Sequence, residues 1–157
     1  MTSASLIPVE RSPTLARLRG YTLEELAAVA RAGLVFHDQG RTDEARALFA
    51  GLTAVNPADA YAWRILGVLD LESGDREGAR RAFDRAIALE PGAGAAYAGR
   101  AEVHLAMGRV DRARADLRDA SRRLEGSDPL FRKVAALLAH VRDPAEPTQL
   151  SRARSRQ

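Results

Sequence analysis

Residues that could bind a metal ion or act as nucleophiles are few and scattered in this sequence. The three histidines, His37, His104 and His140, lie far apart in the chain, and there is no cysteine. Metal sites usually draw their ligands from closely spaced residues, and thiolate chemistry needs cysteine. The pattern therefore predicts neither a metal site nor a bound cofactor. We expect His104, which falls at a core position, to be packed and hydrogen-bonded.

Two further kinds of catalytic motif are also missing. The stretch Pro91-Gly92-Ala93-Gly94 contains glycine, but no predicted strand precedes it and no Gly-Lys pair follows, as a phosphate-binding loop requires. No serine has the strand-to-helix context of an activated nucleophile. The sequence therefore predicts a protein that is not an enzyme.

The excess positive charge lies at the two ends of the chain. The 24 basic residues exceed the 21 acidic ones, and the isoelectric point is about 9.9. Residues 1–20 carry three arginines against one glutamate, and residues 144–157 carry the same excess. A nucleic-acid-binding domain usually has a basic stripe on its folded surface. We therefore expect no nucleic-acid partner.

The sequence also argues against a membrane location. No run approaches the roughly 18 apolar residues needed to cross a bilayer, and the first residues lack the apolar stretch of a signal peptide. The absence of cysteine suits a reducing compartment. We expect a cytoplasmic protein that does not insert into membranes.

A 34-residue repeat organises the rest of the chain. Gly40, Gly74 and Gly108 recur at this interval, and an alanine follows each glycine by five residues. A large apolar residue follows each of these alanines by four, namely Phe49, Phe83 and Leu117. This period is typical of paired antiparallel helices joined by a glycine turn. Because one pair cannot bury its apolar face alone, about three pairs must stack.

Apolar residues at spacings of three and four predict the core face of each helix. The core positions of the first helices hold Val29, Ala32, Gly33 and Phe36, then Trp63, Leu66 and Gly67, then Tyr97, Arg100 and Ala101, of which only Arg100 is charged. On the second helices they are Ala45, Phe49 and Leu52, then Ala79, Phe83 and Ala86, then Ala113, Leu117 and Ala120. Thr22-Leu23-Glu24-Glu25 reads as a capping box, and Asp128-Pro129 as the start of a closing helix.

The predicted fold class is all-α, a superhelical stack of three helix–turn–helix repeats with a C-terminal capping helix. The domain covers residues 21–143, with repeats at about 26–59, 60–93 and 94–127 and the capping helix at about 129–142. Residues 1–20 are expected to form a partly disordered leader. Residues 144–157, where proline and serine stand among arginines, are expected to form a disordered basic tail.

The pattern resembles the tetratricopeptide repeat over about residues 26–127. The second repeat has the family's residues at Trp63, Leu66, Gly67, Gly74, Ala79, Phe83, Ala86 and Pro91. Asp70 departs from the pattern, at a position that is usually aromatic, and we expect it to make a structural hydrogen bond. The resemblance implies a protein-binding scaffold, because the first helices line a concave groove in this family.

The chain is also similar to the class II chaperones of type III secretion systems, which hold translocator proteins before export. The matching segments are Gly40-Arg41-Thr42-Asp43-Glu44-Ala45, Phe49-Ala50-Gly51-Leu52, Asn56-Pro57, Leu66-Gly67 and Ala101-Glu102. The resemblance implies a noncatalytic chaperone or adaptor for a hydrophobic client. Such chaperones often dimerise through the leader, so a homodimer is allowed. The alternative is a general scaffold subunit of a multiprotein assembly.

A second stripe of mostly small or aliphatic residues lies beside the core stripe on each first helix. By the resemblance, this stripe lines the concave face. It predicts a peptide-binding groove formed by Leu34, His37, Tyr61, Arg64, Val68, Leu71, Ala98, Glu102 and Leu105. In the alternative, the closing helix or the leader fills this groove.

Two charged residues interrupt the core pattern of the third repeat. Arg100 stands where the other repeats have Ala32 and Leu66. Asp116 stands where they have Leu48 and Ala82. Because an unpaired buried charge costs several kcal/mol, we predict an ion pair between them across the third hairpin.

Overall fold

A computed structural model describes residues 15–141, and every regular element in this range is an α-helix. The chain divides into two units, one ending at Ala58 and one beginning at Asp59, and each is described by itself. Residues 1–14, which are most of the predicted leader, and residues 142–157, which include all of the predicted tail, lie outside the described residues. Between residues 15 and 141, none of the helices combines the length and the apolar character needed to cross a membrane.

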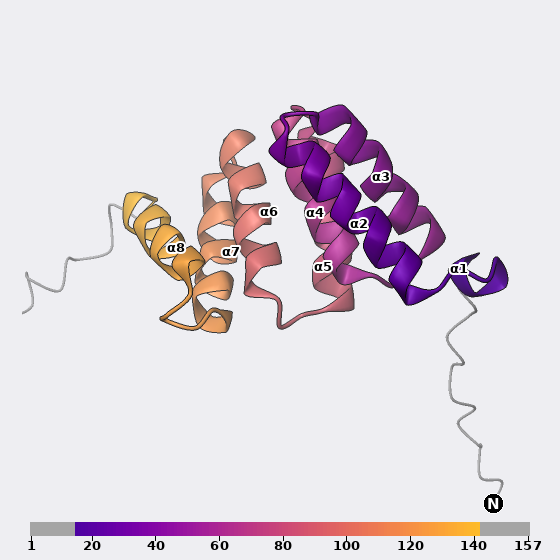
Figure 1. The fold of residues 1–157 in the computed structure, drawn as a ribbon. Coiled ribbons are helices and arrows are strands. Elements are labelled where there is room, and N and C mark those ends of the chain that lie inside the picture. The colour runs from indigo at the N-terminus through magenta and orange to yellow at the C-terminus, as the bar shows by residue number, and fades with distance from the viewer. Residues whose placement is uncertain (1–14, 142–157) are drawn as a thin grey trace, which may run out of the picture. The chain divides into compact units, whose positions relative to one another are not determined.

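The first unit consists of a short helix and one helical hairpin (Figure 1). Its elements are α1 (Leu15–Leu18), α2 (Leu23–Asp38) and α3 (Thr42–Val55). The predicted capping box is confirmed, because the Glu25 N–H donates to Thr22 Oγ1 at 3.1 Å and the Thr22 N–H donates to Glu25 Oε2 at 2.8 Å. The hairpin turn is at Gly40, whose φ of 73° favours glycine.

Close packing joins the two helices of this hairpin. Phe49 is fully buried, and a Cβ added to Gly33 would lie 2.7 Å from its ring. Val29 and Ala32, which the sequence places in the core, are instead exposed. That prediction is wrong because these side chains are smaller than those at the same positions of the second repeat, and they do not exclude solvent from this side of the hairpin. The equivalent residues of the second repeat are Trp63 and Leu66.

The second unit contains five helices, each of which packs against the next in chain order (Figure 1). They are α4 (Ala60–Glu72), α5 (Arg76–Leu89), α6 (Gly94–Ala106), α7 (Val110–Arg123) and α8 (Pro129–His140). The Asp128 carboxylate accepts a hydrogen bond from the Leu130 N–H at 2.8 Å, so the predicted cap of the closing helix is confirmed. The predicted all-α fold, with three helix pairs and a closing helix, is confirmed.

Two apolar clusters form the core of the second unit. One is built around Phe83, and Trp63 packs against it from α4 while remaining half-buried. The other is built around Leu117, and α8 contributes Val134 to it. The closing helix therefore covers apolar surface of the third repeat, as the sequence indicated.

Candidate functional site

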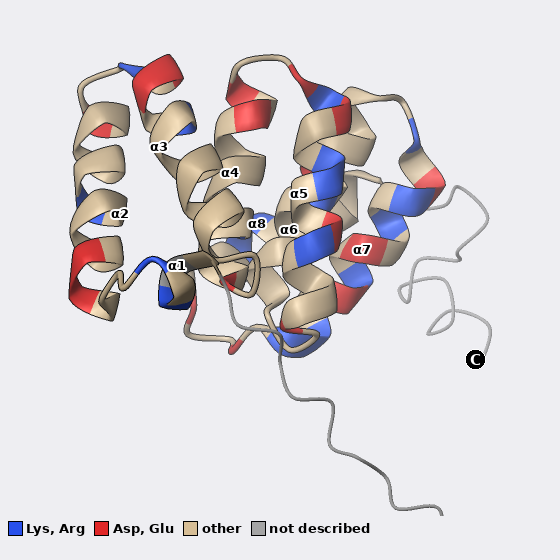
Figure 2. Ribbon diagram, turned by 90° about the vertical axis from the view of Figure 1, so that its right-hand side faces the viewer, with Lys and Arg blue, Asp and Glu red and all other residues tan. Residues whose placement is uncertain are grey.

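In the second unit, the first helix of each pair contains fewer charged residues than the second helix. Helix α6 contains two charged residues and α7 contains eight. Helix α4 contains three and α5 contains six. Figure 2 shows this contrast, with α7 and α5 strongly coloured and α4 and α6 mostly tan. The charge-poor surface of this unit thus belongs to α4 and α6, the helices on which the groove was predicted.

Helix α4 presents an aromatic ring, a cation and aliphatic side chains along one stripe. Tyr61 is 43% exposed, and the Arg64 guanidinium carbon lies 5.1 Å from the centre of its ring. Val68 and Leu71 are half-buried and pack against the cluster around Phe83. This stripe could bind an apolar peptide segment through Tyr61 and the aliphatic residues, with Arg64 donating hydrogen bonds at its edge.

Helix α6 contributes less open surface than the sequence predicted. Ala98 is only 2% exposed and belongs to the core cluster around Leu117, so its prediction as a groove residue is corrected. A stripe adjacent to the core stripe shares its edge with the core, and a methyl group there is covered by its larger neighbours. Leu105 is half-buried against the same cluster.

Helix α8 reaches the face of α6 through one ion pair. Lys133 Nζ lies 2.7 Å from Glu102 Oε1, and both side chains are partly exposed. Such pairs contribute at most about 1 kcal/mol to stability. The closing helix therefore borders this face at Glu102. The part of the face that belongs to α4 consists of Tyr61, Arg64, Val68 and Leu71.

Leu34 and His37, the other two predicted groove residues, lie on α2 in the first unit. Both are half-buried. The structure describes them only within their own unit, so their place in a common groove stays a prediction.

The predicted ion pair of the third hairpin is confirmed, and a third residue joins it. Arg100 Nη2 and Nε donate to the two carboxylate oxygens of Asp116 at 2.7 and 2.9 Å. Arg100 Nη1 donates to Asp84 on α5 at 2.7 Å. The Asp116 hydrogen bonds, opposed by burial, raise the pKa of Arg100 above its usual value. The guanidinium thus links α5, α6 and α7, which is a structural role.

His104 is buried beside this ion pair, but only part of its prediction is confirmed. Its side chain is packed, with Nε2 3.7 Å from Asp116 Oδ2, while its buried Nδ1 has no hydrogen-bond partner within residues 15–141. Burial lowers the pKa of His104, against the opposing effect of Asp116. The folded state therefore favours the neutral imidazole.

This burial predicts a loss of stability in acid. Because the pKa of His104 is lower in the folded state, the unfolded chain binds more protons as the pH falls through the ordinary histidine value of about 6.5. We expect the free energy of unfolding to fall between pH 7.5 and 5.5, and to fall less in His104→Phe, which carries the residue of the first repeat, Phe36. Urea titrations followed by Trp63 fluorescence measure both. An equal loss in the two proteins would show that His104 does not titrate as inferred.

Asp70, the departure from the repeat pattern, is buried near the start of α5. It is 4% exposed, and a Cβ added to Gly78 would lie 3.0 Å from its Oδ2 atom. The N-terminus of a helix carries partial positive charge, which stabilises a nearby carboxylate. This placement accounts for an acidic residue where an aromatic one is usual.

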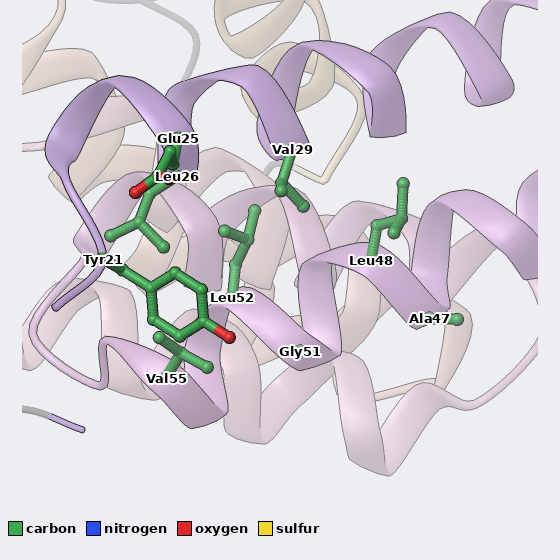
Figure 3. Close-up of a pocket in the computed structure, with 9 residues that line it drawn as sticks. All are labelled: Tyr21, Glu25, Leu26, Val29, Ala47, Leu48, Gly51, Leu52 and Val55. Atoms are coloured by element: carbon green, nitrogen blue, oxygen red, sulfur yellow. The ribbon is translucent and has the colours of Figure 1, made fainter. Parts of the chain in front are cut away.

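Sequence reasoning missed a pocket in the first hairpin, between α2 and α3 (Figure 3). Its lining is almost entirely apolar. The signal that could have revealed it is the loss of bulk at two repeat positions, Val29 and Gly51. Among residues 15–141, no group of three histidine, aspartate or glutamate side chains is arranged to hold a metal ion.

Comparison with known proteins identifies the repeat. Two models of the tetratricopeptide repeat match the sequence, over residues 30–69 and 70–140. None of the curated proteins compared with the sequence matches it.

Several solved structures share the fold. The Yersinia enterocolitica type III secretion translocator chaperone SycD matches with a TM-score of 0.76 at 18% identity, covering 82% of this chain and 98% of SycD. PcrH in complex with the chaperone-binding region of PopD matches with 0.73 at 23%, covering 79% and 96%. The first repeat domain of Spaghetti (RPAP3), bound to an HSP90 peptide, matches with 0.63 at 19%, covering 74% and 94%. With its 34-residue period, its glycine turns and these two family matches, the chain belongs to the tetratricopeptide repeat family.

Proposed function

We propose that this protein is a noncatalytic chaperone or adaptor that binds a segment of a client protein on the face of α4 and α6. The observation that carries the proposal is the stripe on α4, where exposed Tyr61 and adjacent Arg64 continue into half-buried Val68 and Leu71. Aromatic and arginine side chains are the residue types that most often dominate binding energy at protein interfaces. The low charge of α4 and α6 supports an apolar rather than a highly charged client segment.

We further propose that the client is a type III secretion translocator held in the cytoplasm before export. Support comes from the fold neighbours, since PcrH is bound to part of PopD and SycD to a peptide of the translocator YopD. The peptide bound by the Spaghetti domain is acidic, SRMEEVD. Here the face carries the acidic residue Glu102, and Lys133 is already paired with that glutamate, so an acidic peptide suits this face poorly.

Co-expression tests this proposal directly. The chain is produced together with the product of a neighbouring gene that carries membrane-spanning segments. A chaperone keeps this product soluble and co-purifies with it. We expect Tyr61→Glu to reduce the captured amount roughly tenfold or more, because loss of an aromatic anchor commonly costs about 2 kcal/mol.

The matched control is Val110→Glu. Val110 on α7 is also 43% exposed, so the same charge is added at equal exposure away from the proposed face. It should leave capture and helix content unchanged. Equal capture by the Tyr61 variant would contradict the proposed face, whereas Tyr61-dependent binding of a soluble partner instead would favour the scaffold function.

A further inference from the structure

The first hairpin contains an apolar pocket of about 280 Å³ between α2 and α3. Figure 3 shows its lining, in which side chains of the two helices and of the loop before α2 surround a common space. The lining residues are Tyr21, Glu25, Leu26, Val29, Ala47, Leu48, Gly51, Leu52 and Val55. This volume lies just below the range of roughly 300–1,000 Å³ that is usual for ligand pockets. It suits a short run of side chains rather than a folded domain.

Two residues that differ from the later repeats account for the pocket. Val29 stands where the second and third repeats have Trp63 and Tyr97, so no ring fills the space beside α3. Gly51 stands where they have Arg85 and Asp119. A Cβ added to Gly51 would meet nothing within 4 Å. The first repeat therefore has smaller residues at these two positions than the later repeats have.

Exposed apolar side chains are concentrated in α1, α2 and the loop between them, and two of them, Tyr21 and Val29, line the pocket. Eight large apolar side chains are exposed among the described residues, and six of them lie between residues 15 and 35: Leu15, Leu18, Tyr21, Leu23, Val29 and Val35. Apolar surface concentrated in one region usually marks a contact with another chain segment. An apolar segment that enters the pocket and passes near α1 would cover part of this surface.

We propose that the pocket is a docking site for a segment of the chain's own leader, Leu6-Ile7-Pro8-Val9. This segment ends six residues before α1, and such a connection spans up to roughly 20 Å when extended. Helix α1 lies against α3, which supplies five of the nine lining residues. Since the 14 residues of α3 extend over roughly 21 Å, the leader can reach any part of the pocket.

The composition of the leader matches the pocket. Its four-residue run is apolar, and Arg11 follows it closely. The one charged residue of the lining is Glu25, near the start of α2, and its charge is opposite in sign to that of Arg11. The two prolines, Pro8 and Pro13, restrict the backbone before docking and so lower the entropy lost when the segment is ordered.

A cysteine pair tests this docking in the full-length chain. The protein has no cysteine, so Ile7→Cys and Gly51→Cys together introduce a single pair. A disulfide requires the two Cα atoms to approach within about 7 Å. Under mild oxidation of a dilute sample, we expect an intramolecular disulfide, seen on a non-reducing gel as a faster-migrating monomer.

The matched control pairs Ile7→Cys with Ala50→Cys. Ala50 is the neighbouring exposed residue on α3 and does not line the pocket. The chain between residues 7 and 50 is only one residue shorter than that between residues 7 and 51, so chance encounter alone would give both pairs nearly the same rate. If docking raises the local concentration of the leader at Gly51, we expect the pair with Ala50→Cys to form its intramolecular disulfide about tenfold more slowly. Equal rates for the two pairs would overturn the proposal.

A pocket-filling variant separates docking from chance encounter. Val29→Trp places at position 29 the residue that the second repeat has there, Trp63, so that the ring occupies the pocket. We expect this change to slow the oxidation of the cysteine pair at residues 7 and 51 about tenfold. A disulfide-linked dimer as the main product would show that a second copy supplies the occupant, which contradicts docking within one chain. These outcomes do not depend on the client-binding face of α4 and α6.

Discussion

Replacing Arg100 with leucine is expected to lower the free energy of unfolding of the second unit by about 3 kcal/mol. The substitution leaves Asp116, whose side chain is 7% exposed, without its two guanidinium hydrogen bonds. Removing one partner of a buried pair commonly costs about 3–5 kcal/mol, because the other charge stays buried. Exposure of Arg100 to solvent places the expected loss at the lower end of this range.

The double variant Arg100→Leu/Asp116→Ala separates the ion pair from simple packing. It reproduces the apolar pair of the second repeat, Leu66 and Ala82. We expect it to recover most of the stability lost in Arg100→Leu, since no unpaired buried carboxylate remains. Urea titration followed by the fluorescence of Trp63, the single tryptophan, reports on this unit. Additive losses in the double variant would contradict the buried pair.

Phe83→Ala is expected to destabilise the second unit by about 3–5 kcal/mol. Phe83 is fully buried and its ring contacts two glycines, Gly67 on α4 and Gly99 on α6. A Cβ added to Gly67 would lie 3.0 Å from the ring, and one added to Gly99 would overlap it. The ring therefore fills the space that these two helices leave, and its removal creates a cavity that both helices border.

Phe83→Leu provides the control for this prediction. The third repeat carries leucine at this position, Leu117, which is also fully buried. We expect a loss of under about 1.5 kcal/mol, because much of the apolar volume is kept. The same urea titration measures both variants. Similar stabilities for Phe83→Ala and the unaltered protein would show that the ring does not join the helices.

The repeat period was enough to predict much of this fold. The glycine turns at Gly40, Gly74 and Gly108 have the positive φ values that the spacing requires. Phe49, Phe83 and Leu117 are fully buried, as their common position in the repeat indicated. These features follow from local conformational preference and from helical periodicity, which a single sequence displays.

Features that depend on neighbouring side chains were not predictable in this way. Helical spacing placed Ala98 beside the core, but only packing shows that it is buried. Asp84 joins the Arg100 pair although nothing in its own repeat position sets it apart. The pocket requires two small residues on different helices, Val29 and Gly51, to face one space. Each outcome depends on which volumes meet in three dimensions, which a stripe pattern does not specify.

The most direct test of the client-binding face is amide hydrogen exchange of the chain with and without a co-purified client. If the face of α4 and α6 binds the client, amides of residues 60–72 and 94–106 should exchange more slowly in the complex. Those of residues 76–89 and 110–123, on the charged helices α5 and α7, should change little. Slowing confined to α5 and α7 would contradict the assignment of the binding face to α4 and α6.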